Sequence, residues 1–179
     1  MRIAEMLVQE LDLEAHFTRK ALERVPEDKF RWKPHERSME LGWLATFSAL
    51  VYVWGVDAVE LDEFDFRAPH DPPLQRESAR SRAELLRLFD AKVAAARAAI
   101  SGASDEHLRT TWSLMDGDKV IFSKPRWLVL RTMVFNHAVH HRGQLTVYLR
   151  LLGVPVPAIY NRSADEPGGM FMEHADATH

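Results

Sequence analysis

The sequence predicts an all-α protein, a four-helix bundle with long crossover connections. Four stretches carry apolar residues at every third or fourth position, which is the spacing of one helix face. Long connectors follow the second and third stretches, as in bundles whose helices are not all joined by short hairpins. Only one short segment alternates like a strand, whereas an α/β fold would need several.

Length and composition indicate an ordinary globular chain. Its 179 residues favour one domain, which we expect over residues 1–166, followed by a polar tail at 167–179. The formal net charge of -3 gives no electrostatic reason to expect nucleic acid as a partner, since such binding usually needs a basic face. Because the chain has no cysteine, a thiol nucleophile is absent and a metal site must use His, Asp, Glu or water.

The amino terminus carries acidic residues among its apolar ones and lacks the uninterrupted apolar centre of a secretory signal. No uninterrupted apolar run approaches the roughly 18–20 residues that a membrane-spanning helix needs. We therefore expect a cytoplasmic protein without a membrane partner.

The first two helices are expected at residues 2–25 and from Ser38 to about residue 61. Pro26 ends the first helix, and the connector "PEDKFRWKPHERS" is polar, carries two prolines and is anchored by Phe30 and Trp32. Ser38 is a candidate N-cap for the second helix. Its apolar face comprises Leu41, Leu44, Phe47, Val51 and Trp54.

Residues 62–78 contain three prolines and predict a long loop that crosses one end of the bundle. Ser81 and Glu84 form a capping-box pattern for a third helix that ends at Gly102. Ser104 begins a short helical turn. Residues 111–124 predict a small hairpin or an irregular loop around Asp116 and Gly117.

The last helix is expected from Pro125 to Leu152, with Gly153 ending it. Its predicted stripe contains two histidines within the segment "FNHAVHHRGQ". The full stripe is Leu128, Leu130, Val134, His137, His141, Leu145, Tyr148 and Leu152.

His137 and His141 are the candidate metal ligands. A spacing of four places their side chains about 40° apart around the helix and one turn, ~6 Å, along it, so both can bind one divalent ion. The competing interpretation is a pair of hydrogen-bonded structural histidines. A metal on one ring nitrogen and a hydrogen-bond acceptor on the other would offset the cost of placing imidazoles among apolar residues. The other histidines lack ligand spacing: His35, His70, His107, His174 and His179.

The segment "NHAVHHRGQLTVYLRLLGVPVPAIY" closely resembles the last helix of the DinB-like proteins, four-helix bundles of the DinB and YfiT superfamily that are described as metalloenzymes. The segment "LERVPEDKFRWKPHERSMELGWLA" resembles their first connector and second helix. The resemblance implies a divalent ion, often nickel or zinc, held by three histidines. Two of them correspond to His137 and His141, and the third comes from the second helix.

Phe47 occupies the place of that third histidine, because the chain reads "LATF" where the pattern has L-A-x-H. Three outcomes remain open. Glu14, in a region resembling one that carries a glutamate in the relatives, completes the site as a ligand or acts as a general base. His16 substitutes for it, although the two residues lie about 200° apart around the helix. Alternatively the third protein ligand is lost, and metal binding is weak or absent.

Arg142 either balances a carboxylate, orients a substrate anion or lies in solvent, and Gln144 is expected to make a structural hydrogen bond. Tyr148 and Trp54 are expected in the core. An open metal site could activate water, which predicts a metal-dependent hydrolase of a small molecule. The resemblance implies a second option, a low-molecular-weight-thiol S-transferase. The alternative is a degenerate, metal-poor bundle that acts as a stress-associated binding or interaction module.

Apolar residues outside the stripes predict a homodimer: Trp43, Val53, Trp127 and Val147.

Overall fold

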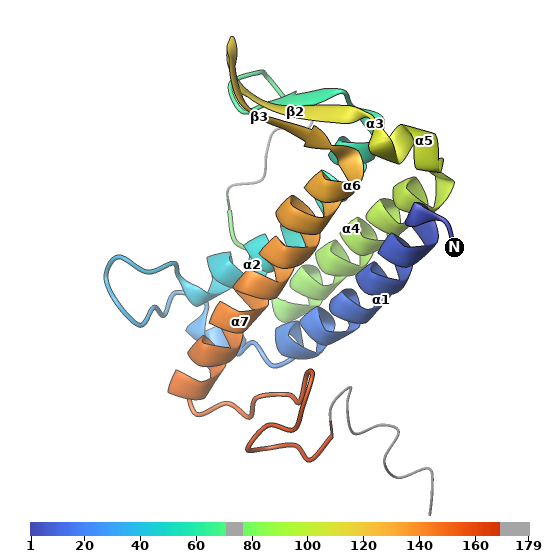
Figure 1. Ribbon diagram of the computed structural model, residues 1–179. Coiled ribbons are helices and arrows are strands. Elements are labelled where there is room, and N and C mark those ends of the chain that lie inside the picture. Colours follow the sequence, from blue (N-terminus) through green and yellow to red (C-terminus); the bar gives the residue numbers. More distant parts are fainter. Residues whose placement is uncertain (71–76, 169–179) are drawn as a thin grey trace, which may run out of the picture.

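The structure, a computed structural model, describes residues 1–70 and 77–168. The longer helices run side by side and α2 and α3 follow one another along them (Figure 1). These helices are α1 (Ile3–Leu22), α2 (Leu41–Leu50), α3 (Val53–Glu60), α4 (Arg82–Gly102) and α7 (Asn136–Leu151). The shorter elements are η1 (Glu27–Lys29), α5 (Asp105–Arg109), α6 (Arg126–Val129), the π-helix η2 (Leu130–Phe135) and the strands β1 (Glu63–Asp65), β2 (Thr111–Asp116) and β3 (Lys119–Pro125).

A three-stranded mixed sheet lies at one end of the helices, so the prediction of an all-α four-helix bundle is wrong. In the order β1-β2-β3, β1 pairs parallel with β2 and β2 pairs antiparallel with β3. The first strand spans only three residues, which is too short for a visible alternation. Its partner lies about fifty residues away, as in the pairing of Phe64 with Leu114. Local sequence patterns therefore predicted a loop, and no strand, for Glu63–Asp65.

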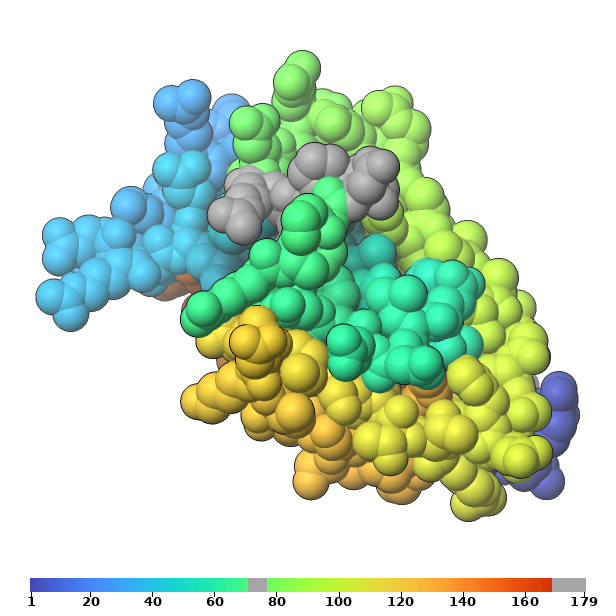
Figure 2. Space-filling view, turned by 90° about the horizontal axis from the view of Figure 1, so that it is seen from above, coloured from blue at the N-terminus to red at the C-terminus, as the bar shows by residue number. Residues whose placement is uncertain are grey.

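The hairpin predicted around Asp116 and Gly117 is confirmed. Gly117 adopts a φ of 61°, a left-handed conformation that glycine reaches without steric cost. Its N–H donates to Asp65 Oδ1 at 2.9 Å, which ties the turn to the end of β1. Viewed from above, the hairpin and the segment around β1 lie together over this end of the helices (Figure 2).

The second predicted helix begins later and is interrupted. Ser38 is not its cap: α2 follows Glu40, and backbone carbonyls of the connector accept its first N–H groups. Leu41 N–H donates to Trp32 O and Gly42 N–H to Phe30 O, both at 2.8 Å. Because the connector already satisfies these donors, no side-chain cap is needed. A turn at residues 51–52 then separates α2 from α3.

The third predicted helix is confirmed with its cap. Ser81 accepts a hydrogen bond from Glu84 N–H at 3.1 Å at the start of α4. Gly55 allows α3 to approach α4 closely, since a Cβ at this position would lie 2.9 Å from Ala96 Cβ. Glycine is therefore required by packing here. Ser104 caps α5 through His107 N–H, also as expected.

Residues Leu41–Glu60 are long and apolar enough, by length and composition, to cross a membrane, yet 61% of this stretch is buried inside the protein. In the structure these residues supply α2 and α3, whose buried residues belong to the main apolar cluster. Burial against the other helices accounts for their apolar character.

The last predicted helix is continuous in space but not uniform. Six residues of π-helix, Leu130–Phe135, lie between α6 and α7. The wider π turns change the phase of the residues that follow, and such segments frequently occur at functional sites. After α7, Gly153 has a φ of 70° and ends the helix as predicted. Residues 153–168 then run across this end of the bundle (Figure 1), and the tail predicted at 167–179 lies mostly outside the described residues.

Of the residues predicted at a homodimer interface, Trp127 and Val147 are exposed, whereas Trp43 and Val53 are partly buried. Homodimerisation stays a prediction.

Arg126 joins the sheet to the helices. Its guanidinium is 2% exposed and donates to the carbonyls of Ala58, at 3.0 Å, and Leu61, at the C-terminal end of α3. It also pairs with Asp62 at 2.6 Å and donates to Thr110 Oγ1 at 2.8 Å. One side chain thus satisfies the terminal carbonyls of α3, where a positive charge is also favoured by the helix dipole.

We predict that Arg126→Ala lowers the free energy of unfolding by roughly 2–3 kcal/mol, because several buried acceptors lose a charged donor. Urea denaturation measures this change. Arg131→Ala, which removes the partner of Glu10 at the exposed surface, serves as the control and should have a much smaller effect. Equal losses in the two variants would contradict the role of Arg126.

Candidate functional site

His137 and His141 lie side by side on α7, as their spacing predicted. Their ring centroids are 4.6 Å apart and the rings are tilted by 40°. His141 is 5% exposed and His137 is partly buried. The two imidazoles therefore lie in a sheltered position, close enough to share one small ligand or ion.

The two nitrogens of His141 have different environments. Nδ1 lies 2.8 Å from Gln144 Oε1. Nε2 is buried and has no hydrogen-bond partner in the described part of the chain. A buried polar atom without a partner is unusual in a native protein and calls for an explanation.

Burial lowers the pKa of both His137 and His141 below the usual histidine value. A hydrogen bond to the backbone of Met133 opposes this effect at His137, and the Gln144 side chain opposes it at His141. Burial thus favours the neutral form of both rings, in which each has one nitrogen lone pair available.

Aromatic side chains of the α2 and α3 region surround this pair. Phe47 meets His141 edge-on, with centroids 4.9 Å apart and an interplanar angle of 88°, and lies 5.6 Å from His137. Trp54 packs on His137 at 5.3 Å, and Trp43 packs on Phe47 at 5.9 Å. The rings on these helices therefore form an apolar wall around the two imidazoles.

Glu14 lies in a separate buried network. Its carboxylate pairs with the Arg142 guanidinium at 2.7 Å and accepts from Tyr160 Oη at 2.8 and 2.9 Å. Arg142 is 2% exposed and also donates to the Glu14 carbonyl at 3.1 Å. Of the interpretations left open for Arg142, the balancing of a carboxylate is the one that the structure confirms.

His16 lies on the exposed side of α1, whereas Glu14 faces inward, so the two do not share a face. Among the other histidines, His107 Nε2 lies 2.7 Å from Val59 O and His70 stacks on Phe64. His174 and His179 lie outside the described residues.

The sequence did not single out Tyr160, although its hydroxyl completes the network of Glu14 and Arg142. Residues 153–168 hold it in place: Lys20 Nζ donates to Ala158 O at 3.1 Å, and Glu166 pairs with Arg24. The available signal was an aromatic residue with a polar end, in the segment that follows the predicted last helix.

Comparison with known proteins identifies the family. The family model of the DinB family matches residues 2–170. The chain belongs to the DinB family. The recognition made from the helix motifs is therefore confirmed.

Two solved structures share the DinB-like fold. A DinB-like protein from Bacillus cereus is 22% identical with a TM-score of 0.65, covering 87% of this chain and 97% of that one. A DinB-like protein from Bacillus subtilis is 19% identical with a TM-score of 0.63, covering 84% of this chain and 95% of that one. The curated proteins contain no match to the chain.

The ligand set implied by the DinB resemblance is only partly present. His137 and His141 stand together, and the side chain from α2 that contacts both of them is Phe47. Within residues 1–70 and 77–168, no group of three or more His, Cys, Asp or Glu side chains could hold a metal ion. Ser48, next to Phe47, donates its hydroxyl to Leu44 O at 2.7 Å. The described residues therefore do not supply the three-ligand set that the resemblance implies.

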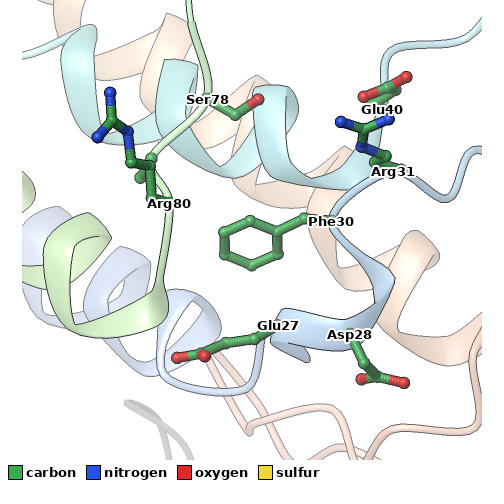
Figure 3. Close-up of a pocket in the computed structure, with 8 residues that line it drawn as sticks. Glu27, Asp28, Phe30, Arg31, Glu40, Ser78 and Arg80 are labelled. Atoms are coloured by element: carbon green, nitrogen blue, oxygen red, sulfur yellow. The ribbon is translucent and has the colours of Figure 1, made fainter.

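A cavity of about 590 Å³ lies elsewhere, between the first connector and the start of α4 (Figure 3). Its lining carries carboxylates and guanidinium groups around Phe30, including Glu27, Arg31 and Arg80. These charged side chains are exposed and of both signs. Neither candidate histidine lines this cavity, so it is not part of the site.

We predict that Arg142→Met lowers the free energy of unfolding by about 3–5 kcal/mol, because Glu14 then remains buried without a cation. Adding Glu14→Leu should recover most of this loss, since the uncompensated charge disappears. Urea denaturation of both single variants and the double variant measures the coupling. If the losses of free energy in the two single variants simply added up in the double variant, the ion pair between Glu14 and Arg142 would not be the main connection between α1 and α7.

Proposed function

We propose that this DinB family protein binds a divalent transition-metal ion through His137 and His141, with no third protein ligand. The observation that carries the proposal is the buried Nε2 of His141, which has no partner among the described residues. Neutral imidazoles 4.6 Å apart between ring centroids suit nitrogen-preferring ions such as nickel and zinc.

Two protein ligands leave most coordination positions to water or a small molecule. A bound divalent ion would supply a Lewis acid for hydrolysis or for transfer of a low-molecular-weight thiol, and the resemblance implies the second of these reactions. The protein's own residues supply position and shelter: Gln144 holds His141, and Phe47 and Trp54 exclude water from one side of the pair. Glu14 is engaged with Arg142 and Tyr160, so no step of this proposal uses it.

Phe47 favours a second candidate, a metal-poor bundle that acts as a binding or interaction module. Its ring contacts both imidazoles edge-on, in the place where the resemblance puts a third histidine. In this alternative the aromatic wall takes an apolar ligand, and the histidines serve as packing residues. The two candidates differ in whether the native chain takes up an ion.

We predict that the native chain, purified without an affinity tag, binds about one nickel or zinc ion per chain in equilibrium dialysis with elemental analysis. His141→Ala and His137→Ala should each lose this binding, because a single imidazole on a helix holds such an ion poorly. His16→Ala is the matched control, since it removes an exposed histidine outside the pair. Equal, substoichiometric metal in the native chain and in His137→Ala would favour the metal-poor alternative.

We predict that Phe47→His tightens the binding of nickel or zinc by roughly tenfold or more, because it adds a third imidazole ligand beside the existing two. Phe47→Leu removes the ring without adding a ligand and separates this effect from simple opening of the site. Isothermal titration calorimetry measures both variants. An equal gain in Phe47→Leu would show that Phe47 acts only by filling space.

A further inference from the structure

Gln144 lies three residues after His141 on α7 and places its Oε1 atom 2.8 Å from His141 Nδ1. The two residues therefore occupy the same side of the helix, one turn apart. Gln144 is itself exposed, whereas the ring that it contacts is buried. This is the hydrogen bond that the structure gives to a nitrogen of the His141 ring.

The contact determines where the ring carries its proton. A carboxamide oxygen can only accept a hydrogen bond, so His141 Nδ1 must be the donor. A neutral imidazole has only one N–H, so a ring that donates from Nδ1 to Gln144 carries no proton on its other nitrogen. His141 Nε2 is then the unprotonated nitrogen, and it is the same atom that lies buried without a partner.

The neighbours of His141 do not compete for this arrangement. Phe47 contacts the ring edge-on and offers no hydrogen-bond acceptor. The rings of His137 and His140 lie 4.6 and 5.0 Å away between centroids. No hydrogen bond joins them to His141 within the described part of the chain.

We propose that Gln144 is the positioning residue of the site: it fixes the proton of His141 on Nδ1 and thereby presents the Nε2 lone pair to a divalent cation. The cation in this inference rests on the proposed function. The position of the proton rests only on the hydrogen bond between Gln144 and His141. A ligand that is oriented by an acceptor on its other nitrogen binds metal more tightly, because its ring orientation and tautomer are already set.

The proton position is tested without any metal, by long-range ¹H–¹⁵N NMR spectroscopy of the imidazoles in the metal-free protein. We expect a protonated Nδ1 and an unprotonated Nε2 for His141 in the native chain. Gln144→Glu, which keeps an acceptor oxygen, should retain this pattern, and Gln144→Leu should lose it. Gln9→Leu, at an exposed position of α1, is the control.

Observation of an Nε2–H tautomer in the native chain would overturn the inference, because the carboxamide would then present its NH₂ group to Nδ1. An unchanged tautomer in Gln144→Leu would overturn it as well, since the ring would not depend on Gln144.

The second measurement is the zinc affinity of the same variants by calorimetry. Gln144→Leu should weaken zinc binding by about 10- to 100-fold, the usual effect of losing such an orienting partner, whereas Gln144→Glu should not weaken it. Equal zinc affinity in the native chain and Gln144→Leu would refute the positioning role. Absence of zinc binding in every variant, with the expected tautomer in the native chain, would refute the proposed function and leave the tautomer assignment standing.

Discussion

The buried ion pair between Arg142 of α7 and Glu14 of α1 sets the rotation of the last helix. Both charges are withdrawn from water, so they are stable only while they remain paired and hydrogen-bonded. Successive residues on a helix point about 100° apart. Because Arg142 faces α1, its neighbour His141 faces α2 and contacts Phe47. The polar network and the candidate site are thus two consequences of one helix orientation.

Different residues hold the sheet, the segment after α7 and the histidine pair in place. Arg126 fastens the sheet to the end of α3, whereas Tyr160 brings residues 153–168 back to the network of Glu14 and Arg142. The histidine pair lies against aromatic residues of the α2 and α3 region. Membership of the DinB family explains the overall likeness to solved DinB-like proteins. This chain has Phe47 where the resemblance implies a third histidine, so the proposed metal binding does not follow from family membership.

Patterns confined to a few neighbouring residues were predictable. Helical spacing located α1, α4 and α7, Ser81 with Glu84 located a helix start, and the spacing of His137 and His141 placed their rings together. Interactions between distant residues were not predictable. The pairing of β1 with β2, the capping of α2 by backbone carbonyls of the connector and the insertion of Tyr160 all depend on contacts that leave no local periodicity.

The most direct test of metal binding by His137 and His141 is a crystal structure of the tag-free protein soaked with nickel, with anomalous diffraction recorded at the nickel edge. If the two histidines bind the ion, we expect a single strong anomalous peak at coordination distance, about 2.1 Å, from His141 Nε2, shared with His137 and lying beside Phe47. A structure at saturating nickel in which the two imidazoles pack against Phe47 with no anomalous peak between them would contradict it.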